Sequence, residues 1–322
     1  MSLYNVLYFM GIKGIIMLVI TGITGKSGKY LWGEINKNDY SFIKQYPDIR
    51  LSVRQTSNLE FLNGSNIKPK LYCGDLNDLI YIDKLTKDVD ILFHIAGIRC
   101  SIPLVKMAIK NGVQWIILVH TTGIYSKYKA AGEEYREIDA RVYELTQQND
   151  VRLTILRPTM IYGTINDNNM IIFIKMLSHL KFMPVVNHAN YALQPVHCRD
   201  LGKAYFQVLM NREKCENNDY ILSGKSPILL IDIFKIISTN LGVKNKYISI
   251  PFFIAYFGAW LIYLFSIMQV DFREKVQRLC EPRIFPHDDA IRDFGYAPME
   301  FKKGIKEEVE EYKLKKFNSV RR

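Results

Sequence analysis

Leu-Val-Ile-Thr-Gly-Ile-Thr-Gly-Lys-Ser-Gly occupies residues 18–28 and continues an apolar run that begins at Ile15. Its glycines recur at every third position, and residues 29–35 then have the composition of a helix. A turn needs glycine where the backbone adopts positive φ, and where a side chain would keep a phosphate from the backbone N–H groups. The stretch therefore predicts a buried strand, a tight turn and a helix N-terminus that hold the pyrophosphate of a dinucleotide.

Strands and helices alternate along the first half of the chain. Short apolar runs predict further strands at residues 49–53, 70–73, 89–95, 115–119 and 153–156. Helical spacing of apolar residues lies between them at residues 79–85, 103–110 and 133–148. This order predicts an α/β protein with a Rossmann-type doubly wound parallel sheet, whose cofactor lies at the carboxyl ends of the strands.

Past Pro158 the alternation loosens and helical patterns dominate. Helices are predicted at residues 171–180, 200–210, 231–241 and 302–316, and extended segments at residues 194–197 and 220–223. We expect three parts: an N-terminal extension (1–16), an NAD(P)-binding Rossmann domain (17–158), and a mixed segment (159–322). The last part should return partly to the sheet and form a smaller helix-rich substrate lobe.

The first 16 residues are mostly apolar, and Lys13 carries their one charge. A secretory signal has a basic start and a cleavage site before the mature domain, whereas this run continues into the first strand. We therefore expect an extension rather than a signal peptide. Met17 is a candidate for the true start of translation, and the mass of the natively expressed protein would decide.

The composition fits an ordered globular protein in a reducing compartment. Of the 322 residues 48% are hydrophobic and 23% are charged, and the formal net charge is +11. That charge favours phosphates, nucleotide sugars or acidic lipid, and no nucleic-acid-binding motif accompanies it. The five cysteines are scattered and the six histidines lack metal-ligand spacing. We expect free thiols, no metal site, and a cytoplasmic location that could extend to the inner face of the membrane.

Four motifs, in this order, resemble those of a known family. They are Thr21-Gly22-x-x-Gly25-x-x-Gly28, Gly74-Asp75-Leu76, His94-Ile95-Ala96-Gly97 and Leu156-Arg157-Pro158-Thr159-Met160-Ile161-Tyr162-Gly163. Together they resemble the extended short-chain dehydrogenase/reductases. More narrowly, they are similar to the atypical branch of NAD(P)-binding, NAD-dependent epimerase/dehydratase-like and nucleoside-diphosphate-sugar epimerase-like proteins. The resemblance covers residues 17 to 301 approximately, and it implies the Rossmann fold and a nicotinamide cofactor.

The resemblance implies a cofactor contact for each residue that matches a motif. The pyrophosphate would lie against the turn formed by Thr21, Gly22, Thr24, Gly25, Lys26, Ser27 and Gly28. Asp75 would bond the adenine amine and Leu76 would pack on its ring. The nicotinamide and its ribose would lie against Ala96, Gly97 and Pro158. The alternatives are that Asp75 caps a helix and that Pro158 only ends its strand.

The choice between NAD and NADP rests on the end of the second strand. NAD enzymes usually carry an acidic residue there, bonded to the ribose 2′-OH. Asp48 precedes the strand and so lies at its wrong end, whereas Arg54 directly follows it. A guanidinium suits a 2′-phosphate, so we favour NADP(H). NAD, with Arg54 stacked on the adenine, is the alternative.

The catalytic residues that the resemblance implies are Thr121 and Tyr135. The family uses Tyr-x-x-x-Lys, in which the lysine lowers the tyrosine pKa, but here the lysine position holds Asp139. Arg136, Lys127 or Lys129 could supply the missing cation. The pair Tyr125 and Lys129 has the right spacing but belongs to a loop.

Candidate substrate contacts are Thr122, Tyr162 and His197. The segment that holds His197 and Asp200 resembles one that returns to the family's substrate cleft. A histidine with a purely structural role is the alternative. His120, at the end of its strand, is a further candidate for facing the cofactor, with burial as the alternative.

Residues 248–270 contain no charged side chain, and their aromatic residues are Phe252, Phe253, Tyr256, Phe257, Trp260, Tyr263 and Phe265. The run is as long as a membrane span. Three interpretations stay open for the helix predicted at 251–268: it packs in the lobe or in a homodimer, it lies on an anionic membrane surface, or it spans. The basic residues at 273, 275 and 278 favour contact with a membrane surface.

Three functions follow from these patterns. The first is an NAD(P)-dependent oxidoreductase or epimerase-like enzyme acting on a nucleotide sugar, a lipid-linked sugar or a similar polar metabolite. Hydride would pass between a substrate carbon and nicotinamide C4, with Tyr135 as the acid/base and Thr121 bonding the reacting oxygen. The second is a non-catalytic NADP(H) sensor that resembles NmrA-like proteins, which Asp139 favours. The third is a membrane-surface scaffold.

Overall fold

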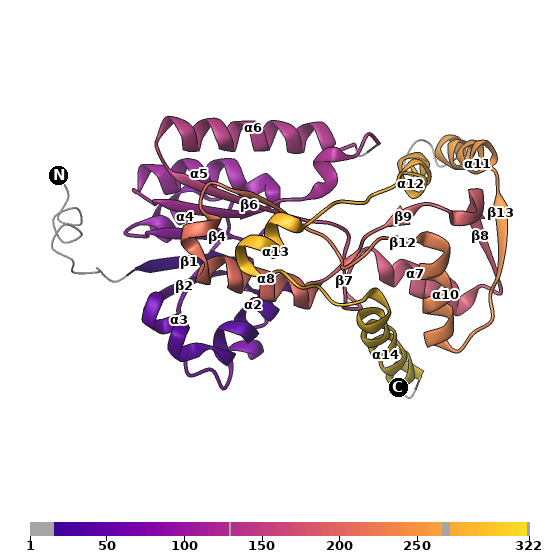
Figure 1. Cartoon of the computed structure of the whole chain (residues 1–322), viewed down its shortest axis with the longest axis horizontal. Helices are drawn as coiled ribbons and strands as arrows, with labels where there is room; N and C mark the ends of the chain where they lie inside the picture. The colour runs from indigo at the N-terminus through magenta and orange to yellow at the C-terminus, as the bar shows by residue number, and fades with distance from the viewer. Residues whose placement is uncertain (1–15, 129, 266–270, 321–322) are drawn as a thin grey trace.

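A parallel sheet of seven strands organises the larger part of the molecule (Figure 1). The computed structural model describes residues 16–128, 130–265 and 271–320. The strands are β1 (Met17–Thr21), β2 (Asp48–Val53), β3 (Lys70–Cys73), β4 (Ile91–His94), β5 (Trp115–Val119), β6 (Arg152–Pro158) and β11 (Asp219–Leu222). Their order is β11-β6-β5-β4-β1-β2-β3, so the direction of winding reverses beside β1. The predicted Rossmann-type sheet is confirmed, and ligands bind such sheets where the order reverses.

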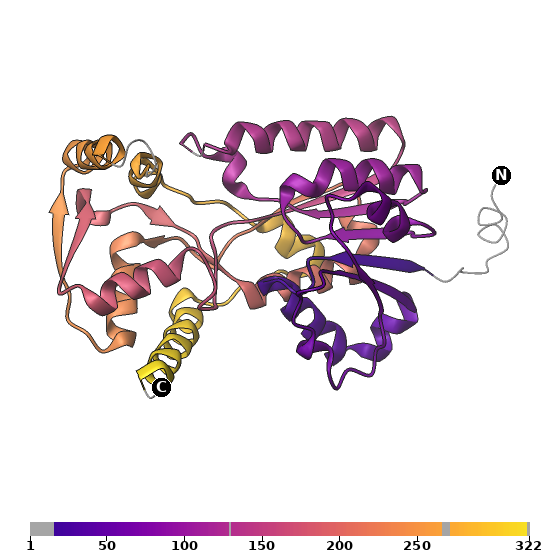
Figure 2. The same cartoon turned by 180° about the vertical axis from the view of Figure 1, so that it is seen from behind.

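Helices cover both faces of this sheet (Figures 1 and 2). One face carries α4 (Leu79–Thr86), α5 (Ser101–Lys110) and α6 (Gly132–Gln148), which share one buried cluster with the strands. The other face carries α2 (Lys26–Lys37), α3 (Asp39–Gln45), α8 (Cys198–Met210) and α13 (Asp288–Phe294), which share a second. Strands buried on both faces read as continuous apolar runs, which is why their positions could be predicted.

Segments from beyond Pro158 return to the sheet. β11 pairs with β6, and α8 packs against α2 closely enough that a Cβ on Gly202 would lie 2.4 Å from the Tyr30 side chain. The short α9 (Arg212–Cys215) links α8 to β11. The Rossmann core is thus completed by residues from the second half of the chain.

The remaining elements form a smaller lobe around a third buried cluster. Its packed helices are α7 (Met170–His179), α10 (Leu230–Leu241) and α14 (Phe301–Val320). Three two-stranded sheets join them: β7 (Ile161–Tyr162) with β10 (Val196–His197), β9 (Ala192–Leu193) with β12 (Ile228–Leu229), and β8 (Phe182–Val186) with β13 (Lys246–Ile250). α11 (Phe252–Phe265) and α12 (Arg273–Leu279) complete the lobe.

The predicted elements agree with the structure except at boundaries and in short pieces. α2 begins at Lys26, three residues earlier than predicted, because the turn leads directly into it. The predictions did not include α3, α12, α13 or the β8–β13 pair. Residues 1–15 of the predicted extension lie outside the described residues.

α11 covers the described part of the helix predicted at 251–268; residues 266–268 lie outside the described residues. Ala259 is its one buried residue. Within the described ranges, no helix combines the length and the hydropathy that crossing a bilayer requires.

Candidate functional site

The turn after β1 is shaped by close contacts within the chain. Gly22 has φ +76°, and a Cβ there would lie 2.5 Å from the backbone nitrogen of Ala96. A Cβ on Gly28 would lie 2.5 Å from the carbonyl oxygen of Gly22. Thr21 uses its hydroxyl to bond the buried His94 ring, with 2.7 Å between Oγ1 and Nδ1. Both glycines are therefore required by packing, and the contact between Thr21 and His94 joins the ends of β1 and β4.

Gly25 is less crowded than the other two glycines. A Cβ there would meet only the Gly22 carbonyl, at 3.1 Å. Gly25 is the N-cap of α2, and no side chain caps this helix end in the described structure. The first backbone N–H groups of α2 are therefore left for another acceptor, and the helix dipole favours an anionic one. A dinucleotide pyrophosphate fits these groups, with Lys26 and Ser27 beside it.

These residues line a cleft of about 930 Å³ between the sheet and the smaller lobe. The Rossmann side contributes Gly22, Gly25, Lys26, Ser27, Ile95, Thr121, Thr122, Gly123, Tyr125, Ser126, Lys127 and Tyr128. The other side contributes Thr159, Met160, Ile161, Asn168, Asn169, Leu193, Gln194, Arg278, Cys280, Glu281, Pro282, Arg283, Ile284 and Phe285. The cleft is large enough for a nucleotide-sized ligand.

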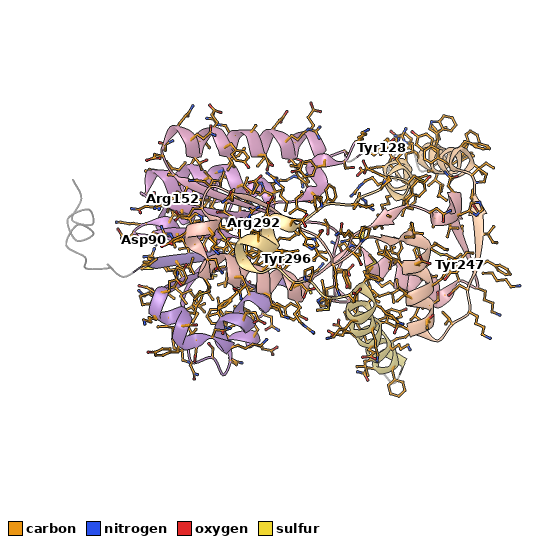
Figure 3. The ribbon with its side chains drawn as sticks, viewed as in Figure 1. Asp90, Tyr128, Arg152, Tyr247, Arg292 and Tyr296 are labelled. Carbon is orange, nitrogen blue, oxygen red and sulfur yellow. The ribbon has the colours of Figure 1, made fainter. Side chains whose placement is uncertain are left out.

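A loop from the Rossmann side closes over one end of this cleft. Ser126 donates a hydrogen bond of 2.6 Å to Glu281, and the backbone N–H of Lys127 donates one of 2.9 Å to the same carboxylate. The rings of Tyr125 and Phe285 lie 5.7 Å apart. Figure 3 shows the labelled Tyr128 at the tip of this loop, beside α12. The two sides of the cleft are thus held together by side chains that also line it.

Two arginines of the smaller lobe bring positive charge into the cleft. The pKa of Arg283 is lowered to about 10, mainly by burial and to a smaller extent by the positive charge of Arg278. The Nε atoms of Arg278 and Arg283 are both buried and have no hydrogen-bond partner among the described residues. A buried guanidinium nitrogen without an acceptor is costly, so both side chains are suited to bind an anion that enters the cleft.

Thr121 and Thr122 follow β5 at the floor of the cleft. Thr121 Oγ1 accepts a hydrogen bond of 3.0 Å from the backbone N–H of Gly123. Accepting that bond fixes the oxygen without using the hydroxyl proton, which can still be donated to a ligand. Thr122 instead donates to the Pro158 carbonyl at 3.3 Å, and so connects the ends of β5 and β6.

Asp139 belongs to a buried network behind the cleft rather than to its lining. It accepts hydrogen bonds from Arg157 Nη1 and pairs with His120 Nδ1, each at 2.5 Å. Arg157 also donates to Asp219 at 2.8 Å. Burial would raise the pKa of Asp139, but its hydrogen bond to His120 and the charge of Arg157 outweigh burial and lower it. The carboxylate therefore fastens α6 to β5 and β6.

This network includes a serine arranged like that of a hydrolase triad. Ser101 Oγ lies 3.0 Å from His120 Nε2, on the opposite side of the ring from Asp139. Ser101 is fully buried, however, at 0% exposure. A nucleophile must reach its substrate, so we interpret this hydrogen-bonded chain as structural.

Comparisons with known proteins agree with this architecture. No protein-family model matches the chain. A UDP-glucose 4-epimerase of Rickettsia bellii (strain OSU 85-389) is 37% identical over 84 residues, or 26% of this chain. The matched part spans only 24% of that curated relative.

Solved structures match over nearly the whole chain. The protein gox2253 superposes with a TM-score of 0.73 at 22% identity, over 94% of this chain and 99% of its own. A UDP-glucose 4-epimerase from Thermotoga maritima, solved with UDP-glucose, gives 0.68 at 16% identity, over 93% and 99%. A UDP-glucuronic acid 4-epimerase from Bacillus cereus, in complex with NAD, gives 0.68 at 13% identity, over 93% and 99%. The chain has the fold of these epimerases. The resemblance to extended short-chain dehydrogenase/reductases is thereby confirmed at the level of the fold.

Within this epimerase fold, Tyr135 lies in the first turn of α6. It precedes Asp139 by one turn on the same helix face. Its ring packs partly into the cluster around α5, and it is not among the residues that line the cleft. Arg99 lies over this ring, 5.6 Å from its centre, and also forms two hydrogen bonds to Glu134. The catalytic role of Tyr135 stays a prediction.

The cation beside Tyr135 is one that the sequence did not reveal. Arg136, one of the predicted sources, donates to the Ile124 carbonyl at 2.9 Å. Lys127 lines the cleft, and Lys129 lies outside the described residues. Arg99 follows β4, far from Tyr135 in sequence, and only the packing of that segment against α6 brings the two together.

Tyr162 on β7 and His197 on β10 are buried and do not line the cleft. Their rings meet edge to face at 5.1 Å, and each is 1% exposed. His197 Nδ1 accepts a bond from the N–H of Arg199 and so caps α8. The structure gives these side chains a packing role against α14, and their contact with substrate stays a prediction.

The remaining predicted cofactor residues lie at strand ends outside the cleft lining. Arg54 follows β2, while Asp48 begins that strand and pairs with Lys70 at 2.6 Å. The alternative role of Asp75 as a helix cap is wrong, because Asp78 caps α4 and Asp75 bonds Asn77. The remaining residues, at or after the carboxyl ends of β1, β3, β4 and β6, are Thr24, Leu76, Ala96, Gly97 and Pro158. No cluster of metal-ligating side chains occurs in the described parts of the chain.

Proposed function

We propose that this protein is a nicotinamide-dinucleotide-dependent enzyme of the epimerase or dehydratase type that acts on a nucleotide sugar. The observation that carries the proposal is one cleft that joins two anion sites. The uncapped N-terminus of α2 would serve the cofactor, and Arg278 and Arg283, whose Nε atoms are buried without a described partner, would serve the substrate. A nucleotide sugar has a diphosphate, which suits two guanidinium groups.

The turn at Gly22 to Gly28 would hold the cofactor pyrophosphate through backbone N–H groups. Ala96, Gly97 and Pro158 would border the nicotinamide and its ribose. When bound, nicotinamide supplies reversible hydride transfer at a sugar carbon. The protein's part is to orient the sugar, exclude water and move a proton.

Thr121 would donate its hydroxyl proton to the reacting oxygen of the sugar. Tyr135 would carry the proton to and from that oxygen, with Arg99 in the role of the family's lysine. Asp139, held by Arg157 and His120, would orient α6 and with it Tyr135.

For the choice of cofactor we propose NADP(H), because Arg54 follows β2 where a ribose 2′-phosphate would lie. Replacement by alanine, Arg54→Ala, should weaken NADPH binding by roughly tenfold to a hundredfold, since it removes a charge-assisted bond. NADH binding should change little. Calorimetric titration of both dinucleotides measures this, and preference for NADH in the unchanged protein would reverse the assignment.

The test of the function is turnover of UDP- and dTDP-sugars with each dinucleotide, followed by product separation. Conversion of at least one nucleotide sugar is expected. In Arg283→Gln the KM should rise, because the substrate diphosphate loses a positively charged binding partner. Tight dinucleotide binding without conversion of any sugar would instead support a non-catalytic sensor.

The proton carrier is tested by comparing two tyrosines. Tyr135→Phe should lower kcat by about 10²–10⁴-fold and leave cofactor affinity unchanged. Tyr125→Phe, which alters the cleft lining, is the matched control and should mainly affect KM. If Tyr125→Phe abolished turnover and Tyr135→Phe did not, the assignment to Tyr135 would be overturned.

A further inference from the structure

α11 lies at the end of the smaller lobe away from the Rossmann sheet (Figures 1 and 2), and it presents a large apolar surface. Its 14 residues carry no charge, and 70% of Phe253 and 84% of Phe265 are exposed. We define the apolar helix surface as the exposed side chains of Phe253, Ile254, Phe257, Trp260, Ile262, Leu264 and Phe265. Contiguous apolar surface of this kind marks an interaction site.

The apolar helix surface extends too far around the circumference of α11 to be covered by a single packed helix or sheet. At about 100° per residue, its side chains spread over roughly 200° of the helix circumference. A helix that packs on another protein element buries a stripe nearer to 100° wide. Phe253, Phe257 and Trp260 form the centre of one such stripe, but Ile262 lies almost opposite to them. A fluid apolar medium covers all of these side chains at once.

The described length of α11 bears on how it can meet such a medium. Its 14 described residues span about 21 Å, which is shorter than the hydrocarbon core of a bilayer, about 30 Å. It is therefore suited to lie in the plane of the membrane surface. Trp260 and Tyr263 are of the type that prefers the headgroup level.

Basic side chains border the apolar helix surface on both sides in sequence. Lys244 and Lys246 precede it and are exposed, and Arg273 and Lys275 follow it. Arg273 lies 4.1 Å from the centre of the Tyr263 ring, which ties α12 to the base of α11. Residues 241–277, which exclude the Arg278 of the cleft, contain four basic and two acidic side chains. This excess complements the negative surface of an anionic bilayer.

The neighbouring β8–β13 pair also exposes apolar side chains. Phe182 and Ile248 are 57% and 50% exposed, and each belongs to a strand of that pair. α11 starts directly after β13, and its first N–H, at Phe252, is held by the Asn187 side chain at 3.0 Å. The helix is therefore fixed to a packed support, so that docking would orient the whole lobe.

We propose that α11 docks this protein onto an anionic phospholipid bilayer, lying in the interface with its apolar side chains among the upper acyl chains. Lys244, Lys246 and Lys275 would contact lipid phosphates. The proposal is independent of the proposed enzymatic function.

The experiment is flotation of the full chain with vesicles of phosphatidylcholine alone or mixed equally with phosphatidylglycerol. The protein should float with the mixed vesicles and bind phosphatidylcholine at least tenfold more weakly. Replacing Phe253 and Phe257 together by serine should weaken binding by roughly a hundredfold, about tenfold for each ring withdrawn from lipid. Replacing Lys244, Lys246 and Lys275 by glutamine should weaken it by roughly fivefold for each charge.

Matched controls come from the opposite end of the molecule. Tyr40 and Ile80 are 82% and 81% exposed on α3 and α4, and their double replacement by serine should leave flotation unchanged. Glutamine at Lys44, Lys84 and Lys106 controls for net charge. If the Phe253 and Phe257 variant floated as well as the unchanged protein, the proposal would fail.

Tryptophan fluorescence gives a site-specific reading. Trp32 and Trp115 are buried in the Rossmann core, whereas Trp260 is 39% exposed. Brominated acyl chains should therefore quench Trp260 alone, and Trp260→Phe should remove the quenching while flotation persists. Absence of flotation, together with a dimer in solution that the Phe253 and Phe257 variant dissociates, would assign the surface to a second copy and overturn the proposal.

Discussion

Two buried carboxylates, one in each half of the molecule, have opposite electrostatic surroundings. Asp139 on α6 lies between Arg157 and His120, and these partners lower its pKa. Glu308 on α14 lies against Asp167, and burial, then its bond with that second acid, raise its pKa to about 9. Both side chains are less than a tenth exposed.

The difference shows that burial alone does not decide whether an acid is ionised. A buried carboxylate stays charged where a guanidinium and a ring N–H supply the interactions that water would give. Glu308 has the N–H of Gly163, at 2.8 Å, but no cation among its described contacts. The Rossmann half thus uses a charged link between elements, whereas the smaller lobe uses a protonated one.

The largest expected effect follows from removing the charged link. Asp139→Ala leaves the buried Arg157 with the partly exposed Asp219 as its remaining described ion-pair partner, so the free energy of unfolding should fall by about 3–5 kcal/mol. Because the pKa of Asp139 is lowered by folding, this contribution is present above its unfolded pKa of about 3.9 and is lost as pH falls below it. Urea unfolding at neutral pH measures the loss.

Asp83→Ala is the matched control for this prediction. Asp83 pairs with Lys110 at 3.1 Å on the surface, where solvent screens the pair, so its removal should cost much less than the removal of Asp139. Equal losses in the two variants would mean that the buried network contributes no more than a surface pair.

The second prediction concerns Glu308→Gln, which keeps an acceptor for Gly163 and adds a donor for Asp167. Folding raises the pKa of Glu308, so its stabilising contribution is full below the unfolded pKa and is lost as pH rises toward the folded value. The variant should match the unchanged protein near about pH 4 and exceed it by about 1–3 kcal/mol near about pH 8.

Thermal unfolding across this pH range tests the second prediction. A parallel decline of both proteins with rising pH would show that Glu308 does not take up a proton on folding. Glu308 would then be ionised in the folded protein, as Asp139 is in the Rossmann half.

The smallest expected effect lies at the end of the charged network. Ser101→Ala removes one hydrogen bond to His120 and should cost about 1 kcal/mol in stability. Dinucleotide affinity should not change, since Ser101 is buried behind the cleft. Loss of activity at unchanged stability and affinity would contradict the structural role given to this serine.

Much of the fold could be predicted because its signals are local. The central strands of the sheet are apolar runs, and Gly22 and Gly28 stand where the nearby backbone leaves no room for a side chain. The seven-residue helices α12 and α13 were missed, because two turns contain too little periodicity to detect. Asp139 could be recognised as a departure from the family pattern, but its partners could not be named.

By itself, the sequence determined the Rossmann sheet, the glycine-rich turn after β1 and the presence of an uncharged aromatic helix. Each depends on residues that are neighbours along the chain. Only the tertiary structure decided that Arg99 lies over Tyr135, that Arg278 and Arg283 enter the cleft, and that α11 is left uncovered. Those outcomes depend on how segments distant in sequence pack against one another. No local segment of the sequence specifies the free energy of such contacts.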